Sequence, residues 1–527
     1  MNKRNVLLLA AAVLGIVSLL ASRTAMAQVE AILPVHEFPI LGRNFAIGAF
    51  AVGHVIFPAI SLGGPIVALI SEILGTVRRD LRYDRFAKTV LKFTAIVFSV
   101  GATFGVVIVV LFAALTPGFW MLGVNIFTWP LVLEGIMFFL EAATLYAYWY
   151  MWDRMADRRG LHLSLGVGNI IFGTITMLII NGVGAIMLTP PEGLVPVLQD
   201  LASGGIKQLP EISLGLAASL LYLGNPTWMI LNLHRFVANI SFVGFLFAAV
   251  MAFYALRDRQ SESRSFYNWA TGYSLLWGVI PVFFMPLIGF EYVSAIRDYQ
   301  QSFGQAIPQL YQALTGNGAG TMYAPFTNIM ITKNWTFTAL VAFLSLMVIA
   351  TSAYFVRRAN GGTVGYGSLM LQLVGGLLLV VNIGGMTEDY IGLVFLVTGA
   401  LIAVVNYVQK SKGIDFSVDI PAWGYYAAMV TSIIVTYTIG VMGFVREMAR
   451  FPYLVPGVMR IADMAPHSTA PTGMETTAGH VLLVVTVAVI LDAIFILIGL
   501  KLTHVPAVEA APAMEPVRAR VTQAAGV

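Results

Sequence analysis

Residues 130–151 read PLVLEGIMFFLEAATLYAYWYM, and this stretch decides the fold class of the chain. It is mainly apolar and reaches the length of about 20 residues that a helix needs to cross a bilayer. Its two carboxylates, Glu134 and Glu141, stand seven positions apart and so lie on nearly one face of a helix. A charge at membrane depth is costly and marks a functional position by default. The stretch therefore predicts a membrane helix that carries chemistry on one face.

The composition extends the membrane assignment to the whole chain. Of 527 residues, 58% are apolar and only 11% are charged, and the mean hydropathy is +0.83. A soluble globular protein is about 25% charged, so a soluble enzyme, a disordered protein and a nucleic-acid-binding protein are excluded. The absence of cysteine excludes disulfides, iron–sulfur clusters, c-type haem attachment and thiolate zinc sites. We therefore expect an all-α polytopic membrane protein.

Hydrophobic segments divide the chain into a leader, a membrane domain and a tail. Residues 1–27 combine basic residues, an apolar run and small residues at the end, as a secretory signal peptide does, with an uncleaved signal anchor as the alternative. We expect about 11 transmembrane helices in residues 28–505 and a disordered cytoplasmic tail in residues 506–527. The expected spans are residues 45–70, 91–115, 130–151, 165–188, 228–256, 269–290, 335–356, 366–383, 390–408, 423–445 and 481–500. The segments 366–383 and 390–408 could instead form one re-entrant pair.

Basic residues predict the orientation of the helices. Every second loop is basic, beginning with the loops around Arg78–Lys88 and Arg154–Arg159. We therefore expect these loops in the cytoplasm, the mature N-terminus outside and the C-terminus inside a bacterial cytoplasmic (inner) membrane. The cytoplasmic loops lack a glycine-rich phosphate-binding motif, so an ATP-driven pump is not expected.

Few ionisable residues fall within the expected spans, and several share one depth. With this orientation the outer half of the membrane contains His54, Glu134, His234 and Glu447, whereas Glu141 lies deeper and Asp492 lies near mid-span. Structural residues need not cluster in depth, so this group indicates a cofactor layer or an ion site. Imidazole, thioether and carboxylate groups suit haem ligation and proton transfer, but the carboxylates alone could form the cation pathway of a transporter. His162 falls in a basic loop and is expected to be solvated.

These residues resemble those of subunit I of the cytochrome bd oxidases, in a patchy but colinear way across most of the chain. The most specific match is the stretch 130–141 followed by Trp152-Asp153-Arg154. Residues 444–453, FVREMARFPY, resemble a degraded copy of the family's Gly-Arg-Gln-Pro-Trp signature. The other matching positions are Arg43, His54-Val-Ile-Phe-Pro58, Asn181-Gly182, Asn225-Pro226 before His234, and Asp492.

The resemblance implies a set of haems and a role for each matching residue. His234 and a methionine would hold a low-spin haem b, and His54 and Glu447 would stand at high-spin haems, of which one is haem b or haem d. The methionine is Met330 or Met386, with a slight preference for Met330. Glu134 and Glu141 would relay protons from the cytoplasm. Arg450 would lie beside the haems in a catalytic role, and Asn181 and Arg43 would take part in cofactor binding.

Several departures from the family pattern keep the function open. Phe451-Pro452-Tyr453 replaces Gln-Pro-Trp, two further spans precede this signature, and the outside loop 291–334, where the family handles quinol, is short. We predict a bd-type terminal oxidase subunit I-like protein that takes electrons from quinol or another outer donor and pairs with a second membrane subunit. One alternative is a haem electron-transfer subunit without quinol oxidase activity, fed by a periplasmic cytochrome. The other is a cofactor-free ion transporter, which would need broken helices such as a break at Gly63-Gly64-Pro65.

Overall fold

The computed structural model describes most of the chain between residues 43 and 497. The described ranges are 43–115, 117–204, 215–258, 261–282, 284–302, 324–381, 386–411, 420–448, 453–456, 458–460, 483–491, 493–494 and 497. The expected leader, residues 1–27, and the expected tail, residues 506–527, lie outside these ranges, and residues 481–500 lie partly outside them.

Long helices make up almost all of the described structure. The α-helices are α2 (Arg43–Arg78), α3 (Leu81–Leu115), α4 (Pro117–Tyr150), α5 (Arg159–Ile186), α6 (Val195–Gly204), α7 (Leu216–Leu223), α8 (Trp228–Arg257), α9 (Ser261–Val282), α10 (Met285–Ser302), α12 (Ala324–Arg358), α13 (Thr363–Val381), α14 (Met386–Ser411) and α15 (Ala422–Met448). Residues 483–491 are also helical. The described structure further contains two short 3₁₀ helices, η1 (Ala156–Arg158) and η2 (Glu192–Leu194), and an antiparallel pair of strands, β1 (Tyr453–Val455) and β2 (Met459–Arg460).

The described residues contain ten helical segments that are long and apolar enough to cross a membrane. The prediction of an all-α polytopic membrane protein is therefore confirmed. Residues 366–383 and 390–408 fall in two separate helices, α13 and α14, each of spanning length. Helix α2 continues through Gly63-Gly64-Pro65 without a break. Large apolar side chains also face outward, as a bilayer requires, and Val106 and Leu377 are each 63% exposed.

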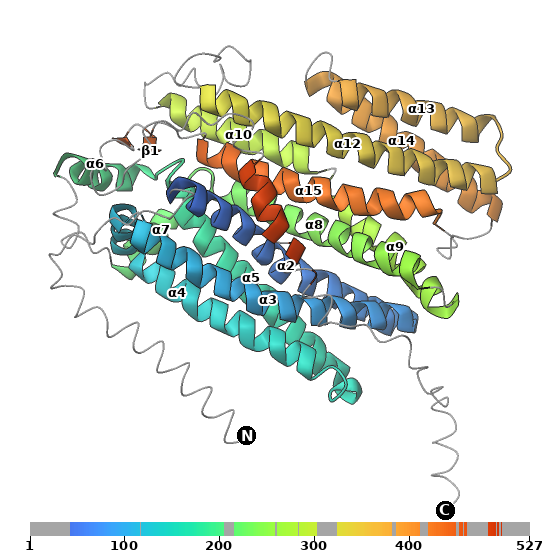
Figure 1. The fold of residues 1–527 in the computed structure, drawn as a ribbon, viewed down its shortest axis with the longest axis horizontal. Coiled ribbons are helices and arrows are strands. Elements are labelled where there is room, and N and C mark those ends of the chain that lie inside the picture. The colour runs from blue at the N-terminus through green and yellow to red at the C-terminus, as the bar shows by residue number, and fades with distance from the viewer. Residues whose placement is uncertain are drawn as a thin grey trace, which may run out of the picture.

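The long helices lie roughly side by side, and helices consecutive in sequence often pack together (Figure 1). Helix α2 packs against α3, α5, α8 and α15, and α8 packs against α9 and α10. Helices α12, α13 and α14 pack together along one side of the bundle, where α12 also contacts α15 (Figure 1). This arrangement places α2, α8 and α15, which carry most of the expected haem ligands, in mutual contact.

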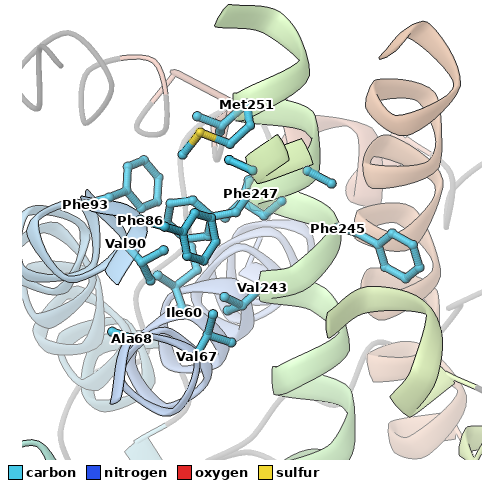
Figure 2. Close-up of a cluster of buried hydrophobic side chains, with 14 of the residues drawn as sticks. Ile60, Val67, Ala68, Phe86, Val90, Phe93, Val243, Phe245, Phe247 and Met251 are labelled. Atoms are coloured by element: carbon cyan, nitrogen blue, oxygen red, sulfur yellow. The ribbon is translucent and has the colours of Figure 1, made fainter. Parts of the chain in front are cut away.

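The main core fills the space between α2, α3 and α8 with aromatic and branched side chains (Figure 2). Phe86 and Phe93 of α3 meet Phe247 of α8 edge-on, with ring centroids 6.2 and 5.3 Å apart. Such aromatic pairs add roughly 0.5–1.5 kcal/mol beyond the burial of their surface. The core thus fixes α2 and α8, and with them His54 and His234, relative to each other.

Candidate functional site

His54 of α2 and His234 of α8 lie on adjoining helices, and each has a glycine beside its ring. A Cβ atom at Gly105 of α3 would lie 3.3 Å from His54 Cε1, and one at Gly289 of α10 would lie 3.8 Å from His234 Nε2. Both imidazoles lie within electrostatic reach of the Arg235 guanidinium. The structure therefore brings these two sequence-predicted histidines into one region, each with the backbone of a neighbouring helix close to its ring.

The His54 ring carries a buried polar atom that needs an explanation. Its Nδ1 is buried and has no hydrogen-bond partner within the described part of the chain. Buried polar groups are nearly always hydrogen-bonded in proteins, so an orphaned one points to an absent group or water. Imidazole nitrogen is a common axial ligand of haem iron. The environment of His54 therefore fits a haem ligand.

A hydrogen-bonded network joins α5 to α8 close to His234. The Asn181 side-chain amide donates to Asn232 Oδ1 at 2.8 Å, and the Asn232 amide donates to the Trp228 carbonyl at 2.8 Å. The Trp228 indole N–H in turn donates to the Leu178 carbonyl at 2.8 Å. Asn181, which the sequence analysis expects in cofactor binding, thus anchors α8 at Asn232. His234 lies two residues further along the same helix.

The paired carboxylates of α4 differ in how tightly they are held. Glu141 is 5% exposed, and its Oε1 lies 2.9 Å from where a Cβ atom at Gly173 of α5 would be. The Asn169 amide donates to the Glu141 backbone carbonyl at 2.8 Å. Glu134 is only partly buried and lies within electrostatic reach of Glu141. The two carboxylates therefore form one unit along α4, with the deeper one fixed by α5.

The other expected site residues are placed only in part. The backbones of Arg43, Met330, Met386 and Glu447 lie in α2, α12, α14 and α15, but their side chains are not described, and Arg450 and Asp492 lie outside the described residues. Arg446, next to Glu447, lies against α5, because a Cβ at Gly184 would be 2.5 Å from its Nη2. Helix α12 packs on α15, whereas the main contacts of α14 are with α12 and α13.

Two buried residues on α2 and α5 correct the sequence analysis. His162 is not solvated in a loop but lies inside α5, 1% exposed, with Nδ1 2.7 Å from Glu72 Oε1. The sequence analysis did not single out Glu72, which is 0% exposed, because the first span was expected to end at residue 70. The spacing between His54 and Glu72 could have indicated that Glu72 belongs to the same buried helix face. Eighteen positions make five helical turns, so a longer helix places both residues on one face.

No group of three or more His, Asp or Glu side chains in the described ranges is arranged to hold a metal ion. A haem needs only one or two axial side chains from the protein, because its macrocycle supplies the other ligands. Single histidines on adjoining helices are therefore the expected form of such a site.

An all-helical membrane bundle that buries imidazoles and paired carboxylates within its spans defines a class: membrane proteins that hold redox cofactors or move protons inside the bilayer. Within this class, the model of the family described as cytochrome bd terminal oxidase subunit I matches residues 43–504, and the chain belongs to this family. The family consists of haem-carrying oxidoreductases of respiratory electron transport. The resemblance seen in the sequence is thereby confirmed.

Two similar proteins support this assignment at different levels. A putative cytochrome bd menaquinol oxidase subunit I from Bacillus subtilis (strain 168) is 29% identical over 103 residues, which are 20% of this chain and 23% of that protein. The matched part is thus less than a quarter of that relative. The structure of bd oxidase from Geobacillus thermodenitrificans matches with a TM-score of 0.50 and 17% identity, over 87% of this chain and 97% of that chain. At this identity the match shows a shared fold.

Proposed function

We propose that the chain is the haem-bearing subunit of a bd-type oxidase that reduces oxygen with electrons from quinol or another donor on the outer side. The observation that carries the proposal is the buried, unpartnered Nδ1 of His54, with a glycine beside its ring, on a helix packed against the one that carries His234. Family membership supplies the reaction class, and these two histidines supply the ligand type that it needs.

The residues fit haem as follows. His234 and Met330 would hold a low-spin haem b, and His54 and Glu447 would serve high-spin haems, with haem b or haem d at the oxygen site. The packing of α12 on α15 supports Met330 over Met386. When bound, haem supplies one-electron transfer and an iron that can bind oxygen. Arg43 and Arg450 would balance negative charge beside the haems, and the amide network of Asn181 would hold the helix of His234 in place.

The carboxylates of α4 would carry protons toward the outer half of the membrane. A protonated carboxyl donates a hydrogen bond and an ionised one accepts it, so Glu141 and Glu134 can exchange a proton through intervening water. The fixed position of Glu141 against Gly173 keeps this step at one place in the bundle. With the basic loops in the cytoplasm, protons would arrive at Glu141 before Glu134.

The proposed function also implies a location in the cell, a partner subunit and an electron donor. We place the chain in a bacterial inner membrane, with its mature N-terminus outside and its C-terminus in the cytoplasm. A second membrane subunit would cover part of the exposed apolar surface. The donor would be quinol or a periplasmic cytochrome.

The test is a reduced-minus-oxidised visible spectrum of the purified protein, with pigment extraction to count and type the haems. The wild type should show a b-type band, and a far-red chlorin band would identify haem d. His54→Ala and His234→Ala should each remove one haem, whereas His467→Ala, at a histidine outside the expected spans, should remove none. Retention of the full haem content in both of the first two variants would overturn the proposal.

A haem electron-transfer subunit without quinol oxidase activity is the second candidate. It is favoured by Phe451-Pro452-Tyr453, which replaces the family's Gln-Pro-Trp. Oxygen uptake with quinol as the reductant separates the two functions, because only the oxidase consumes oxygen under these conditions. The transporter alternative predicts a colourless protein, and the unbroken course of α2 through Gly63-Gly64-Pro65 gives it no support.

A further inference from the structure

A buried ionic network joins α2, α4 and α5 at the end of the bundle that carries the basic loops. Glu72 of α2 is at its centre, 2.7 Å from His162 Nδ1 and 3.0 Å from Arg159 Nε. The Tyr148 hydroxyl donates to Glu72 Oε2 at 2.6 Å, and Arg159 also pairs with Asp84 of α3. None of these five residues has a role in the function proposed above.

The hydrogen bonds of His162 determine where its protons are. Its Nε2 lies 2.9 Å from the Tyr148 backbone carbonyl, which can only accept, so Nε2 must carry a proton. A neutral imidazole protonated at Nε2 has a bare Nδ1. The 2.7 Å contact between Nδ1 and Glu72 Oε1 then needs one further proton, on the ring or on the carboxyl.

The charges around the pair favour the same extra proton. Two carboxylates, Glu72 and Asp84, face one guanidinium, that of Arg159, and Tyr148 donates as a neutral phenol. The network therefore keeps a negative charge unless it holds one further proton, and an uncompensated buried charge is costly. Arg159 is the most exposed member in contact with Glu72, at 24%, and links it to the surface.

One face of α5 leads from this pair to Glu141. His162, Gly166, Asn169 and Gly173 are spaced by four, three and four residues and are all buried, so they form a single line along the helix. Tyr148 lies against Gly166, and Glu141 lies against Gly173 and accepts from Asn169 through its backbone carbonyl. Eleven residues of helix rise about 16 Å. The line therefore connects the basic end of the bundle with the deeper carboxylate of α4.

We propose that the Glu72–His162 pair holds one exchangeable proton and delivers it to Glu141 along this face of α5. In each cycle the pair takes one proton from cytoplasmic water near Arg159 and releases one to water in the α2–α4–α5 interface. Glu141 binds the released proton, so that no proton is gained or lost. Delivery to Glu141 rests on the proposed function, whereas the shared proton rests on the geometry of the pair alone.

The first test is solid-state NMR of the full-length protein in lipid. The His-Leu dipeptide occurs once in the chain, at His162-Leu163. We label histidine with ¹³C at the carbonyl and ¹⁵N in the ring, and leucine with ¹⁵N. Only His162 then has a ¹³C carbonyl bonded to a ¹⁵N leucine amide, so the signals of its ring can be assigned without a variant and without haem. We expect a protonated Nε2 at neutral pH. An unprotonated Nε2 would mean that Nδ1–H donates to an ionised Glu72, and would overturn the shared proton.

The second test is the rate of proton uptake on reduction of the reconstituted protein, followed with a pH-sensitive dye. Glu72→Gln keeps an acceptor for Tyr148 but cannot hold the proton, and His162→Gln removes the other partner. We expect at least tenfold slower uptake in both variants, with unchanged haem spectra, and partial rescue by Glu72→Asp. Asp80→Asn breaks a separate ion pair with Arg82 at the same end of the bundle, outside the charge count of the network, and should stay within twofold of wild type.

The outcomes separate this proposal from the proposed function. Wild-type uptake rates in Glu72→Gln with intact haems would overturn delivery through the pair. Equal slowing in Asp80→Asn would also overturn it, because it would indicate that the loss of any ion pair at this end of the bundle slows uptake. A wild-type protein without haem would end the proposed function and the delivery step with it, but the NMR result would still decide whether the pair holds a proton.

Discussion

At the scale of single residues, the absence of a side chain at Gly173 sets the position of the Glu141 carboxylate. In Gly173→Ala the new Cβ would lie 2.9 Å from Glu141 Oε1, so the carboxylate must move. Because misplacing a reacting group by about 1 Å can cost up to about 100-fold in rate, we expect turnover to fall by about 10- to 100-fold. Haem content should not change. Steady-state oxygen uptake measures the effect.

The matched control is Gly168→Ala on the same helix. There a Cβ would make ordinary contact with Thr144, at 3.7 Å. Its turnover should stay within about twofold of wild type, since nothing has to move. A loss in Gly168→Ala as large as that in Gly173→Ala would show that α5 tolerates no added methyl group, and that the position of Glu141 is not the cause.

A second residue-scale prediction concerns the close approach of Gly105 to the His54 ring. Gly105→Val would press on the ring, because a Cβ alone would already lie 3.3 Å from it. We expect loss of the haem bound at His54 and retention of the low-spin haem b at His234, seen as a change in one component of the reduced-minus-oxidised spectrum. Gly123→Val adds the same side chain where no atom lies within 4 Å of the Cβ position, and should leave both components unchanged.

At this scale the sequence could predict those site residues that are costly to place inside a membrane because they are polar or ionisable. His54, His234 and Glu141 stand out because each interrupts a long apolar stretch. Glu72 and His162 lie near the ends of their spans, among basic residues that suggest exposure. They are buried because Arg159 and Tyr148 pack against Glu72. This packing between helices cannot be predicted from one sequence.

At the scale of helices, α8 and α9 approach so closely that only glycine fits between them. A Cβ at Gly244 would lie 2.1 Å from the backbone nitrogen of Gly278, which cannot rotate away. Overpacking a core costs about 1–3 kcal/mol and occasionally more. Gly244→Ala should therefore lower the thermal midpoint of the detergent-solubilised protein and weaken haem retention at His234 on α8. Gly272→Ala in α9, where the Cβ would meet nothing within 4 Å, should change neither.

The helices themselves follow from hydropathy, but their ends and partners do not. Apolar stretches predicted ten segments that appear as spans, because a bilayer forces each one into a helix. The helix α2 runs to Arg78, eight residues past the expected end, since a helix continues beyond the apolar core once its polar groups are paired. Which helices touch is decided by small residues such as Gly244 and Gly278, whose partners cannot be identified from one sequence.

At the scale of the whole molecule, every proposed proton route depends on the orientation of the chain in the membrane. This orientation can be measured at the two ends of α5. Asp157 in η1 and Glu192 in η2 are both exposed and flank opposite ends of this helix. The chain has no cysteine, so a single introduced thiol reacts without background. The basic loops predict that the Glu192 end faces outward. A membrane-impermeant maleimide should therefore label Glu192→Cys in intact cells, and Asp157→Cys only after the membrane is opened. The reverse pattern would place Glu72 and His162 on the outer side, and would contradict proton delivery from the cytoplasm even if every haem assignment held.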